Sequence, residues 1–398
     1  MPDRRSIRIL PLSAVAASLT LLLVAGYTGS AASAPLACAS QPVAQTAFAP
    51  TLQARLQQVL DRNKSAFAFP GAEAGVWTAN GSWVGVTGSA AANGKAAPSR
   101  ADHTRIGSIT KTFTVMLLLQ QVDRGLVSLD DPIGKYVKGL PNGNTATLRM
   151  LASMTSGIPS YTFDAGFQQR LFEHPDTVFS PQQLLGYVRG AKVLYPAGTR
   201  VDYSNSNTVA LGQVIEQVTG KSFAKAMQDG ILDPLGLSGT SFPGNSPLLP
   251  GPHLDGITMQ GQPEGKTADA TSWNPSWGYS AGAMISTLDD LRCWAVALGT
   301  GGALVSDRLQ RERMASVDST VPPNSPAKAY ALGFGVFNGW IGHTGELPGY
   351  NSSIQYDPKT GTTVVVMVNS DIPVGPAGSE RNPAPTISDQ LIEAMAAP

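Results

Sequence analysis

The sequence predicts an α+β fold, in which an antiparallel sheet carries flanking helices and a second, mainly helical region is inserted between its parts. Strand patterns occur early, within residues 73–87, and again within residues 334–368, while the stretch between them contains mostly helical patterns and loops. We therefore expect a sheet region of about residues 51–124 and 330–396 and a helical insertion of about residues 125–300. A cleft between the two regions is the expected binding site.

The N-terminal part of the sheet region contains one predicted helix and one predicted hairpin. Residues 51–63 (TLQARLQQVLDRN) have apolar side chains at helical spacing, which predicts an amphipathic helix. Residues 73–77 and 82–87 are predicted strands, and the Asn80-Gly81 pair between them is typical of a two-residue hairpin turn. A further helix is expected to begin at Ser108, where the apolar run is too continuous for a surface helix.

The remaining elements fill the insertion and then return to the sheet. Helical patterns in the insertion include residues 206–218 and 222–231. The C-terminal part has strand patterns followed by one helix, at residues 334–339, 350–356, 362–368 and 386–396. The sequence contains no internal repeat. Because strands and a helix are predicted toward both ends of the chain, both ends are expected to complete a single sheet.

Charge and composition favour a globular enzyme over a nucleic-acid-binding protein. Of the 398 residues, 14% are charged and the formal net charge is zero, so no polyanionic partner is indicated. The 42 glycines and 30 prolines are not periodic, which fits a loop-rich globular chain and not a fibre. The length permits a large buried core.

Residues 1–39 are predicted to be a signal peptide. Three arginines precede an apolar stretch at residues 9–26, which is followed by small residues that suit a cleavage site. The alternatives are an uncleaved N-terminal membrane anchor and lipid modification of Cys38. The protein is therefore expected to be secreted or held in the cell envelope.

Residues 40–50 are expected to be a linker, and residues 51–395 to form the mature domain. Removal of the signal peptide with its cysteine would leave Cys293 as the single cysteine of the mature chain. We therefore expect no intramolecular disulfide in spite of export.

Ser108 is a candidate nucleophile, because Lys111 follows it by three residues at the start of the predicted buried helix. That spacing places the hydroxyl and the amine on one helix face, and a desolvated lysine can act as the base that activates a serine. The alternative is an N-capping serine with an exposed lysine. Two further Ser-x-x-Lys pairs, at Ser222 and Ser325, are a helix cap and a proline-rich loop, so neither is expected to be catalytic.

Tyr203-Ser204-Asn205 supplies candidate partners for Lys111. A phenol near an ammonium can have its pKa lowered, and Tyr203 could then exchange protons with the serine and the leaving group. Asn205 can accept a hydrogen bond from Lys111 and donate one to a substrate carbonyl. The alternative is an ordinary turn with an exposed tyrosine.

His343-Thr344-Gly345 follows a strand pattern near Trp340 and suits an extended substrate that lies along a strand edge. The alternative is a lone surface histidine in a turn. The similar tripeptide Lys359-Thr360-Gly361 lies in a predicted hairpin turn, so we reject it as a site.

A second nucleophile hypothesis rests on Gly278-Tyr279-Ser280-Ala281-Gly282, which matches the elbow of α/β-hydrolases, with Asp289 and His343 following in order. The elbow needs a buried apolar strand before it, whereas the preceding residues are polar and contain proline, so we disfavour it. The four histidines lack the spacing of zinc ligands and no phosphate-binding loop is present, so no cofactor is expected.

Taken together, the motifs resemble the serine β-lactamase-like hydrolases, and most closely the group of class C β-lactamases, D-alanyl-D-alanine carboxypeptidases and related esterases. The resemblance covers about residues 50–395 and includes the segments RIGSITKTFT, GLVSLDDPIGKYV, LASMTSGIPSY, PAGTRVDYSNSN, GYSAGAMIST and GHTGELPGYNSS. It implies a β-lactamase/transpeptidase-like fold. It also implies that GYSAG is a structural turn.

The resemblance implies that Ser108 is acylated while Lys111 and Tyr203 manage the protons. Asn205 would contact the acyl amide, and His343, Thr344 and Gly345 would line the sheet edge of the cleft. Backbone N–H groups of Ser108 and Glu346 would hold the oxyanion. These roles come from the resemblance and complete the candidate site.

One departure from the family pattern bears on the substrate. Many β-lactamases of this group have lysine where His343 stands, and an imidazole is a weaker anchor for a carboxylate than a fixed ammonium. We therefore expect D-alanyl-D-alanine carboxypeptidase-like hydrolysis of D-alanyl peptides or amides, with β-lactamase or carboxylesterase as alternatives. A non-catalytic peptidoglycan-binding relative is the alternative of another class. The expected partner is a small-molecule or peptidoglycan-peptide substrate, with no nucleic acid and no membrane partner beyond an N-terminal anchor.

Overall fold

The computed structural model describes residues 46–91, 94, 96–376 and 379–396. Its central element is a seven-stranded sheet in the order β2-β1-β11-β10-β9-β8-β7, in which every neighbouring pair is antiparallel. The strands come from the two ends of the described chain: β1 (Gly71–Thr78), β2 (Gly81–Gly88), β7 (Lys328–Tyr330), β8 (Gly335–Phe337), β9 (Trp340–Leu347), β10 (Tyr350–Tyr356) and β11 (Thr363–Val368). The predicted sheet built from both ends is confirmed.

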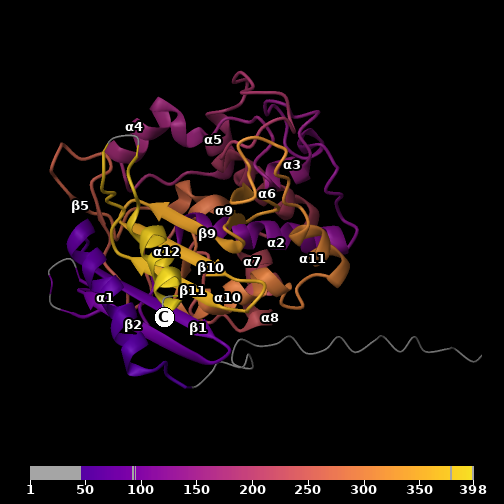
Figure 1. Cartoon of the computed structure of the whole chain (residues 1–398). Coiled ribbons are helices and arrows are strands. Elements are labelled where there is room, and N and C mark those ends of the chain that lie inside the picture. Colours follow the sequence, from indigo (N-terminus) through magenta and orange to yellow (C-terminus); the bar gives the residue numbers. More distant parts are fainter. Residues whose placement is uncertain (1–45, 92–93, 95, 377–378, 397–398) are drawn as a thin grey trace, which may run out of the picture. The chain divides into compact units, whose positions relative to one another are not determined.

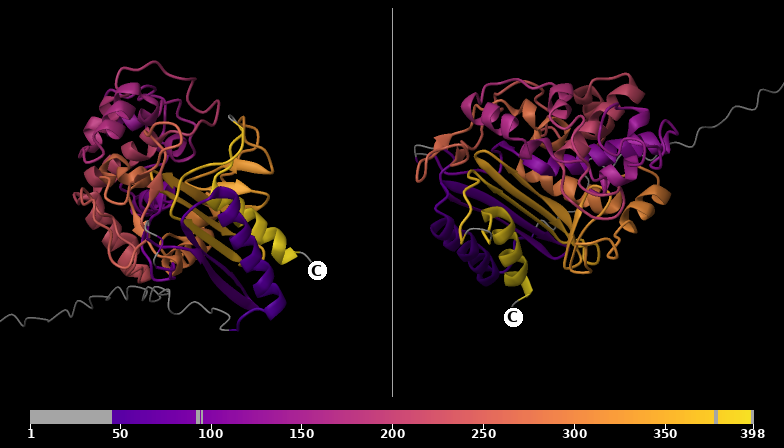
Figure 2. Two further views of the ribbon diagram at one scale, coloured as in Figure 1. Left: turned by 90° about the vertical axis from the view of Figure 1, so that its left-hand side faces the viewer. Right: turned by 90° about the horizontal axis from the view of Figure 1, so that it is seen from above.

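Helices from the two ends of the domain cover one face of this sheet. α1 (Pro50–Phe67) and α12 (Pro383–Ala396) lie side by side against it, as Figures 1 and 2 show. Their apolar side chains join the alternate residues of β1 and β11 in one core, for example Leu60, Val366 and Leu391. The period of two along a strand explains why the intervening residues contribute to the opposite core.

The other face of the sheet is covered by α10 (Leu288–Thr300), and α2 (Thr110–Asp123) lies behind α10. Trp294 of α10 joins the two helices: its ring stacks on Phe113 at a centroid distance of 3.7 Å, and its indole N–H donates to Thr112 Oγ1 at 2.7 Å. Burial of α2 on all sides accounts for its continuous apolar sequence.

The inserted region is mainly helical, as expected. Its helices are α3 (Leu148–Ala152), α4 (Ala165–Glu173), α5 (Pro181–Gly186), α6 (Asn205–Thr219), α7 (Phe223–Met227), α8 (Asp233–Leu235), α9 (Tyr279–Gly282) and, after α10, α11 (Asp307–Met314). Two pairs of short strands lie outside the main sheet, β3 (Thr104–Arg105) with β6 (Ile285–Ser286) and β4 (Ile257–Thr258) with β5 (Ala268–Asp269). This region lies on the α10 side of the sheet (Figure 2).

Several predicted boundaries move. The helix expected at Ser108 begins at Thr110, and Ser108 lies in a preceding 3₁₀ turn, η2 (Gly107–Ile109). The hairpin turn consists of Ala79 and Asn80, because Thr78 already pairs with Gly81. Gly81 is required for packing instead, since a Cβ there would lie 2.5 Å from the Phe48 ring.

One expectation about the ends of the domain needs correction, and others are not tested by the described residues. The end of the expected linker is packed on the sheet, because Phe48 N donates to Ser82 O at 3.1 Å. Cys293 is buried and disulfide-bonded in the full chain. The expectation of no disulfide concerns the mature chain without residues 1–39, so it stays a prediction. The signal peptide and residues 40–45 are outside the described ranges. Within those ranges, no helix is both long and apolar enough to span a bilayer.

Candidate active site

Ser108 and Lys111 are brought together at the junction of η2 and α2. Lys111 Nζ lies 2.9 Å from Ser108 Oγ. The lysine side chain is fully buried although it carries an ionisable amine. The structure therefore places a desolvated amine against an accessible hydroxyl, which is the arrangement that the Ser-x-x-Lys spacing predicted.

The surroundings of Lys111 favour its neutral form. Its amine contacts Asn205 Oδ1 at 2.7 Å and the backbone oxygen of Ala281 at 2.6 Å, and both are uncharged acceptors. Burial lowers the pKa of Lys111 well below its usual value, because an ammonium loses its hydration there without gaining a carboxylate partner. The Ala281 carbonyl, at the end of α9, was not predicted, because no sequence signal marks a backbone acceptor.

Asn205 is held in place by two residues that the sequence did not assign. The Asn205 backbone N–H donates to Ser160 Oγ at 3.1 Å, and its side-chain amide donates to Thr162 Oγ1 at 3.2 Å. These bonds direct Oδ1 toward Lys111. Both hydroxyl residues lie at or just after the segment LASMTSGIPSY, so the family resemblance marked this region without naming a role.

Tyr203 lies beside the pair, with Lys111 Nζ 4.8 Å from the centre of its ring. The expected lowering of its pKa is not observed. Burial of its hydroxyl group, on a side chain that is otherwise partly exposed, raises the pKa of Tyr203, and its hydrogen bond with Ser108 only partly opposes this rise. The physical reason is that Lys111 itself is shifted toward the neutral form, so it offers little positive charge to stabilise a phenolate. Tyr203 is therefore a proton donor at neutral pH.

The segment His343-Thr344-Gly345 belongs to a strand and not to a turn. β8 pairs with β9 only as far as Gly342, so the following residues of β9 have no strand on that side and can pair with an extended ligand. Gly345 is needed for close approach, because a Cβ there would lie 2.0 Å from the backbone oxygen of Ile106. The backbone of Glu346 lies against η2 in the same way, 2.6 Å from a Cβ placed on Gly107.

His343 is buried and uncharged. Its Nδ1 lies 2.6 Å from the backbone oxygen of Thr344, and its Nε2 lies 3.0 Å from the hydroxyl of Tyr330. Burial lowers the pKa of His343 to about 3. His343 is therefore a hydrogen-bonding group of this site and not a cationic one.

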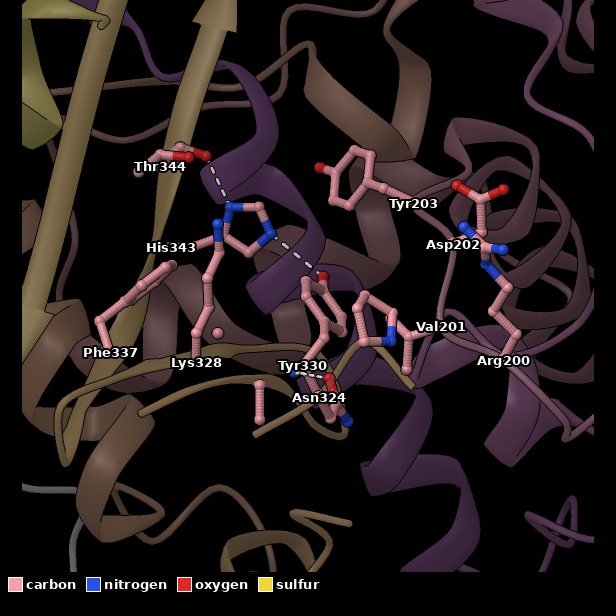
Figure 3. Close-up of a pocket in the computed structure, with 13 residues that line it drawn as sticks. Arg200, Val201, Asp202, Tyr203, Asn324, Lys328, Tyr330, Phe337, His343 and Thr344 are labelled. Carbon is pink, nitrogen blue, oxygen red and sulfur yellow. Dashed lines mark hydrogen bonds between the residues drawn. The ribbon is translucent and has the colours of Figure 1, made fainter. Parts of the chain in front are cut away.

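Two pockets adjoin at Tyr203. The first, of about 400 Å³, contains Ser108 and is lined by aromatic residues, Asn205 and the exposed carboxylate residue Glu346. The second, of about 620 Å³, lies beyond Tyr203 and is bounded by His343 and Thr344 (Figure 3). Ser108 therefore lies at one side of a cleft that continues past the phenol.

The rejected motifs are structural. Ser222 caps α7, while Lys225 pairs with Asp229 at 2.6 Å. Ser280 is fully buried and donates to Thr208 O at 2.9 Å, so it is not a nucleophile elbow. Lys359 lies in an exposed turn between β10 and β11.

Comparison with known proteins agrees with this geometry. The family model described as Beta-lactamase matches residues 54–382. The chain belongs to the beta-lactamase family. As a member with this site, it is a serine hydrolase of the β-lactamase/transpeptidase-like fold.

Relatives and solved structures extend this result. The chain is 31% identical to a D-stereospecific amidohydrolase from Streptomyces sp., with a TM-score of 0.75 over 86% of this chain and 98% of that one. A D-amino acid amidase from Ochrobactrum anthropi SV3, 23% identical with a TM-score of 0.73 over 87% and 99% of the chains, shows the same fold. PbpX of Bacillus subtilis (strain 168) is 27% identical over 67% of this chain. This chain covers only 61% of that relative's length.

Proposed function

We propose that this beta-lactamase family member is an exported hydrolase that cleaves amide or peptide bonds of D-alanyl and related D-aminoacyl substrates through an acyl-enzyme on Ser108. The observation that carries the proposal is the buried Lys111 amine at 2.9 Å from Ser108 Oγ, where burial favours its neutral form. The similarity to a D-stereospecific amidohydrolase over nearly its whole length supports the stereochemistry of the substrate.

The hydrogen bonds of Lys111 give it a free lone pair for catalysis. A neutral amine has two N–H groups, and these are matched by Asn205 Oδ1 and Ala281 O. Its lone pair is then left for the hydroxyl proton of Ser108. When Ser108 Oγ attacks the substrate carbonyl carbon, Lys111 takes that proton, so no free alkoxide has to form.

Tyr203 then serves the leaving group. Its raised pKa keeps the phenol protonated, and it is hydrogen-bonded with Ser108, so it can pass its proton to the departing nitrogen when the C–N bond breaks. Lys111, now an ammonium, restores the proton of Tyr203. The backbone N–H groups of Ser108 and Glu346 are proposed to stabilise the oxyanion, and water then releases the acyl group from Ser108.

The first pocket suits a bulky acyl group. Its walls include side chains of aromatic residues from η4 (Tyr161–Phe163), α4 and the segment before α9, namely Tyr161, Phe163, Phe167, Phe172 and Trp277. Phe163 is 78% exposed, which leaves an apolar ring available to a ligand. This lining supports D-aminoacyl groups larger than D-alanyl as additional substrates.

A turnover panel tests the proposal. Wild type and Ser108→Ala are compared on a diacyl-D-Ala-D-Ala peptide, D-alanine and D-phenylalanine amides, their L-isomers, nitrocefin and a nitrophenyl ester. The proposal predicts turnover of the D-peptide or D-amides by wild type only. Turnover confined to nitrocefin or to the ester would establish the β-lactamase or carboxylesterase alternative. Peptidoglycan binding without any turnover would establish the non-catalytic alternative.

A further inference from the structure

Lys328, which the sequence pattern paired with Ser325, lies in the wall of the second pocket. Ser325 serves only to shape the turn before β7, since its N–H donates to Lys328 O at 2.7 Å and its Oγ accepts from Lys328 N at 3.1 Å. Lys328 is the first residue of β7, and its side chain extends from that strand toward His343 in Figure 3. The pairing with Ser325 is therefore structural, but the lysine side chain faces the cleft.

The second pocket lies on the leaving-group side of Ser108, if the proposed function is correct. Ser108 and Asn205 line the first pocket, and Tyr203 alone among the three lines both. A leaving nitrogen that takes its proton from Tyr203 must face the phenol, so the atoms attached to that nitrogen continue beyond it. The amine product of the reaction therefore occupies the pocket of Lys328.

The lining of this pocket suits a side chain and an anion. Phe337 and Tyr330 provide aromatic walls, and Val201 adds an aliphatic one. Three charged residues line it, namely Arg200, Asp202 and Lys328. In Figure 3 Arg200 and Asp202 lie on one side of Tyr330, and Lys328 lies on the other side and extends into the pocket.

His343 cannot bind a carboxylate in the way that a lysine at its position would. It is uncharged, and each of its ring nitrogens already has a partner, Thr344 O or the Tyr330 hydroxyl. A carboxylate in this pocket needs a charged donor to replace its hydration. Lys328 is the exposed cation on the β7 wall that faces it.

We propose that Lys328 binds the terminal carboxylate of the leaving group, so that the site prefers D-peptides that end in a free acid and an apolar residue over the corresponding C-terminal amides. Tyr330 and Phe337 would contact the side chain of that last residue. Lys328 thus takes over the charge that a lysine in place of His343 would provide, but from β7, which is separated from β9 by β8.

Binding to a variant that cannot turn over the ligand tests this site directly. Ser108→Ala is titrated calorimetrically with D-alanyl-D-phenylalanine and with D-alanyl-D-phenylalaninamide, which differ only at the terminal carboxylate. We expect the acid to bind about 10-fold more tightly than the amide, as one charge-assisted contact at an exposed site provides. Adding Lys328→Met to this variant should weaken binding of the acid about 10-fold and should change the affinity for the amide by no more than about 2-fold.

Matched variants separate Lys328 from general charge effects. Lys359→Met removes an exposed lysine of the β10–β11 turn and should leave both affinities unchanged. Lys328→Arg keeps the charge and should retain the preference for the acid. The proposal would be overturned if Ser108→Ala bound the acid and the amide equally or bound neither. It would also be overturned if Lys359→Met lost the preference for the acid.

The outcome is independent of catalysis. If wild type hydrolyses neither peptide but Ser108→Ala binds the acid through Lys328, the carboxylate site stands and the proposed hydrolase function is wrong. If wild type hydrolyses both peptides with equal kcat/KM and Lys328→Met does not change their ratio, the function stands and the carboxylate site is wrong.

Discussion

Replacement of Tyr203 by phenylalanine removes one hydroxyl from the site and little else. The ring packs edge-on against Tyr330 at a centroid distance of 5.9 Å, and phenylalanine keeps that contact. Tyr203 is 37% exposed, so the loss of its hydroxyl should change the free energy of unfolding by less than about 1 kcal/mol. Any large effect on rate is therefore chemical.

The magnitude depends on the leaving group. A positioned general acid contributes about 10²- to 10⁴-fold, which corresponds to about 2.7–5.4 kcal/mol of transition-state stabilisation. An amide nitrogen needs a proton before it can leave, so Tyr203→Phe should lose this whole factor on a D-aminoacyl amide. A nitrophenolate leaves without a proton, so on the nitrophenyl ester of the same acyl group the loss should stay within about 5-fold.

Single-turnover acylation measures this difference. Wild type, Tyr203→Phe and Lys111→Met are mixed in excess with each substrate, and product release is followed by stopped flow or rapid quench. Lys111→Met is the matched control, because loss of the base that deprotonates Ser108 should slow both substrates. Far-UV circular dichroism and thermal unfolding verify that the three proteins are folded.

Equal losses on the amide and the ester in Tyr203→Phe would refute the assignment of Tyr203 as the acid of the leaving group. The phenol would then act on Ser108 itself, which is one of the two roles that the sequence interpretation gave it. A loss on the ester alone would contradict both assignments.

Three further predictions concern titratable groups. Lys111 must be neutral to accept a proton, so kcat/KM should rise with pH and level off well below the usual lysine pKa; a rise that continues to about pH 10 would contradict this. Because the pKa of His343 is about 3, His343→Gln should leave the pH–rate profile between pH 5 and 8 unchanged in shape, and loss of an inflection near pH 6.5 would refute the neutral histidine. Glu73 is buried on β1, and neither of its carboxylate oxygens has a hydrogen-bond partner among the described residues. Burial raises its pKa, so the folded protein holds this proton more tightly than the unfolded chain does. The free energy of unfolding should therefore fall as the pH rises from about 4.3 through the raised pKa. Glu73→Gln cannot ionise, so its Tm relative to wild type should increase between pH 4 and pH 8, and a constant difference would show that Glu73 does not ionise in that range.

The fold was largely predictable because its elements have strong local signals. Residues 350–356 form β10 as predicted, and α6 differs from its predicted range by one residue at each end. β9 was missed as a complete strand, although it carries His343. Three glycine or hydroxyl positions in GHTGE weaken the strand pattern. Gly345 is required among them because a Cβ there would lie 2.0 Å from Ile106 O.

The site was predictable where side chains supply the chemistry and unpredictable where the environment sets their charge. Motifs identified Ser108, Lys111, Tyr203 and Asn205, and the structure brings them together. The raised pKa of Tyr203 follows from burial, which only the packed structure shows. The prediction that Ser325 and Lys328 lie in a non-catalytic loop was correct for the turn at Ser325. It could not show that Lys328 lines the cleft, because β7 is only three residues long and has too short a pattern to be predicted.

The central claim is that Ser108 is acylated with Lys111 as its base. Intact-protein mass spectrometry after exposure to a D-aminoacyl nitrophenyl ester or a fluorophosphonate, followed by peptide mapping, tests it directly. The account predicts one adduct per chain on the peptide that contains Ser108, at least 100-fold slower labelling of Lys111→Met, and none of Ser108→Ala. An adduct on any other residue, or labelling of folded Lys111→Met at the wild-type rate, would contradict it.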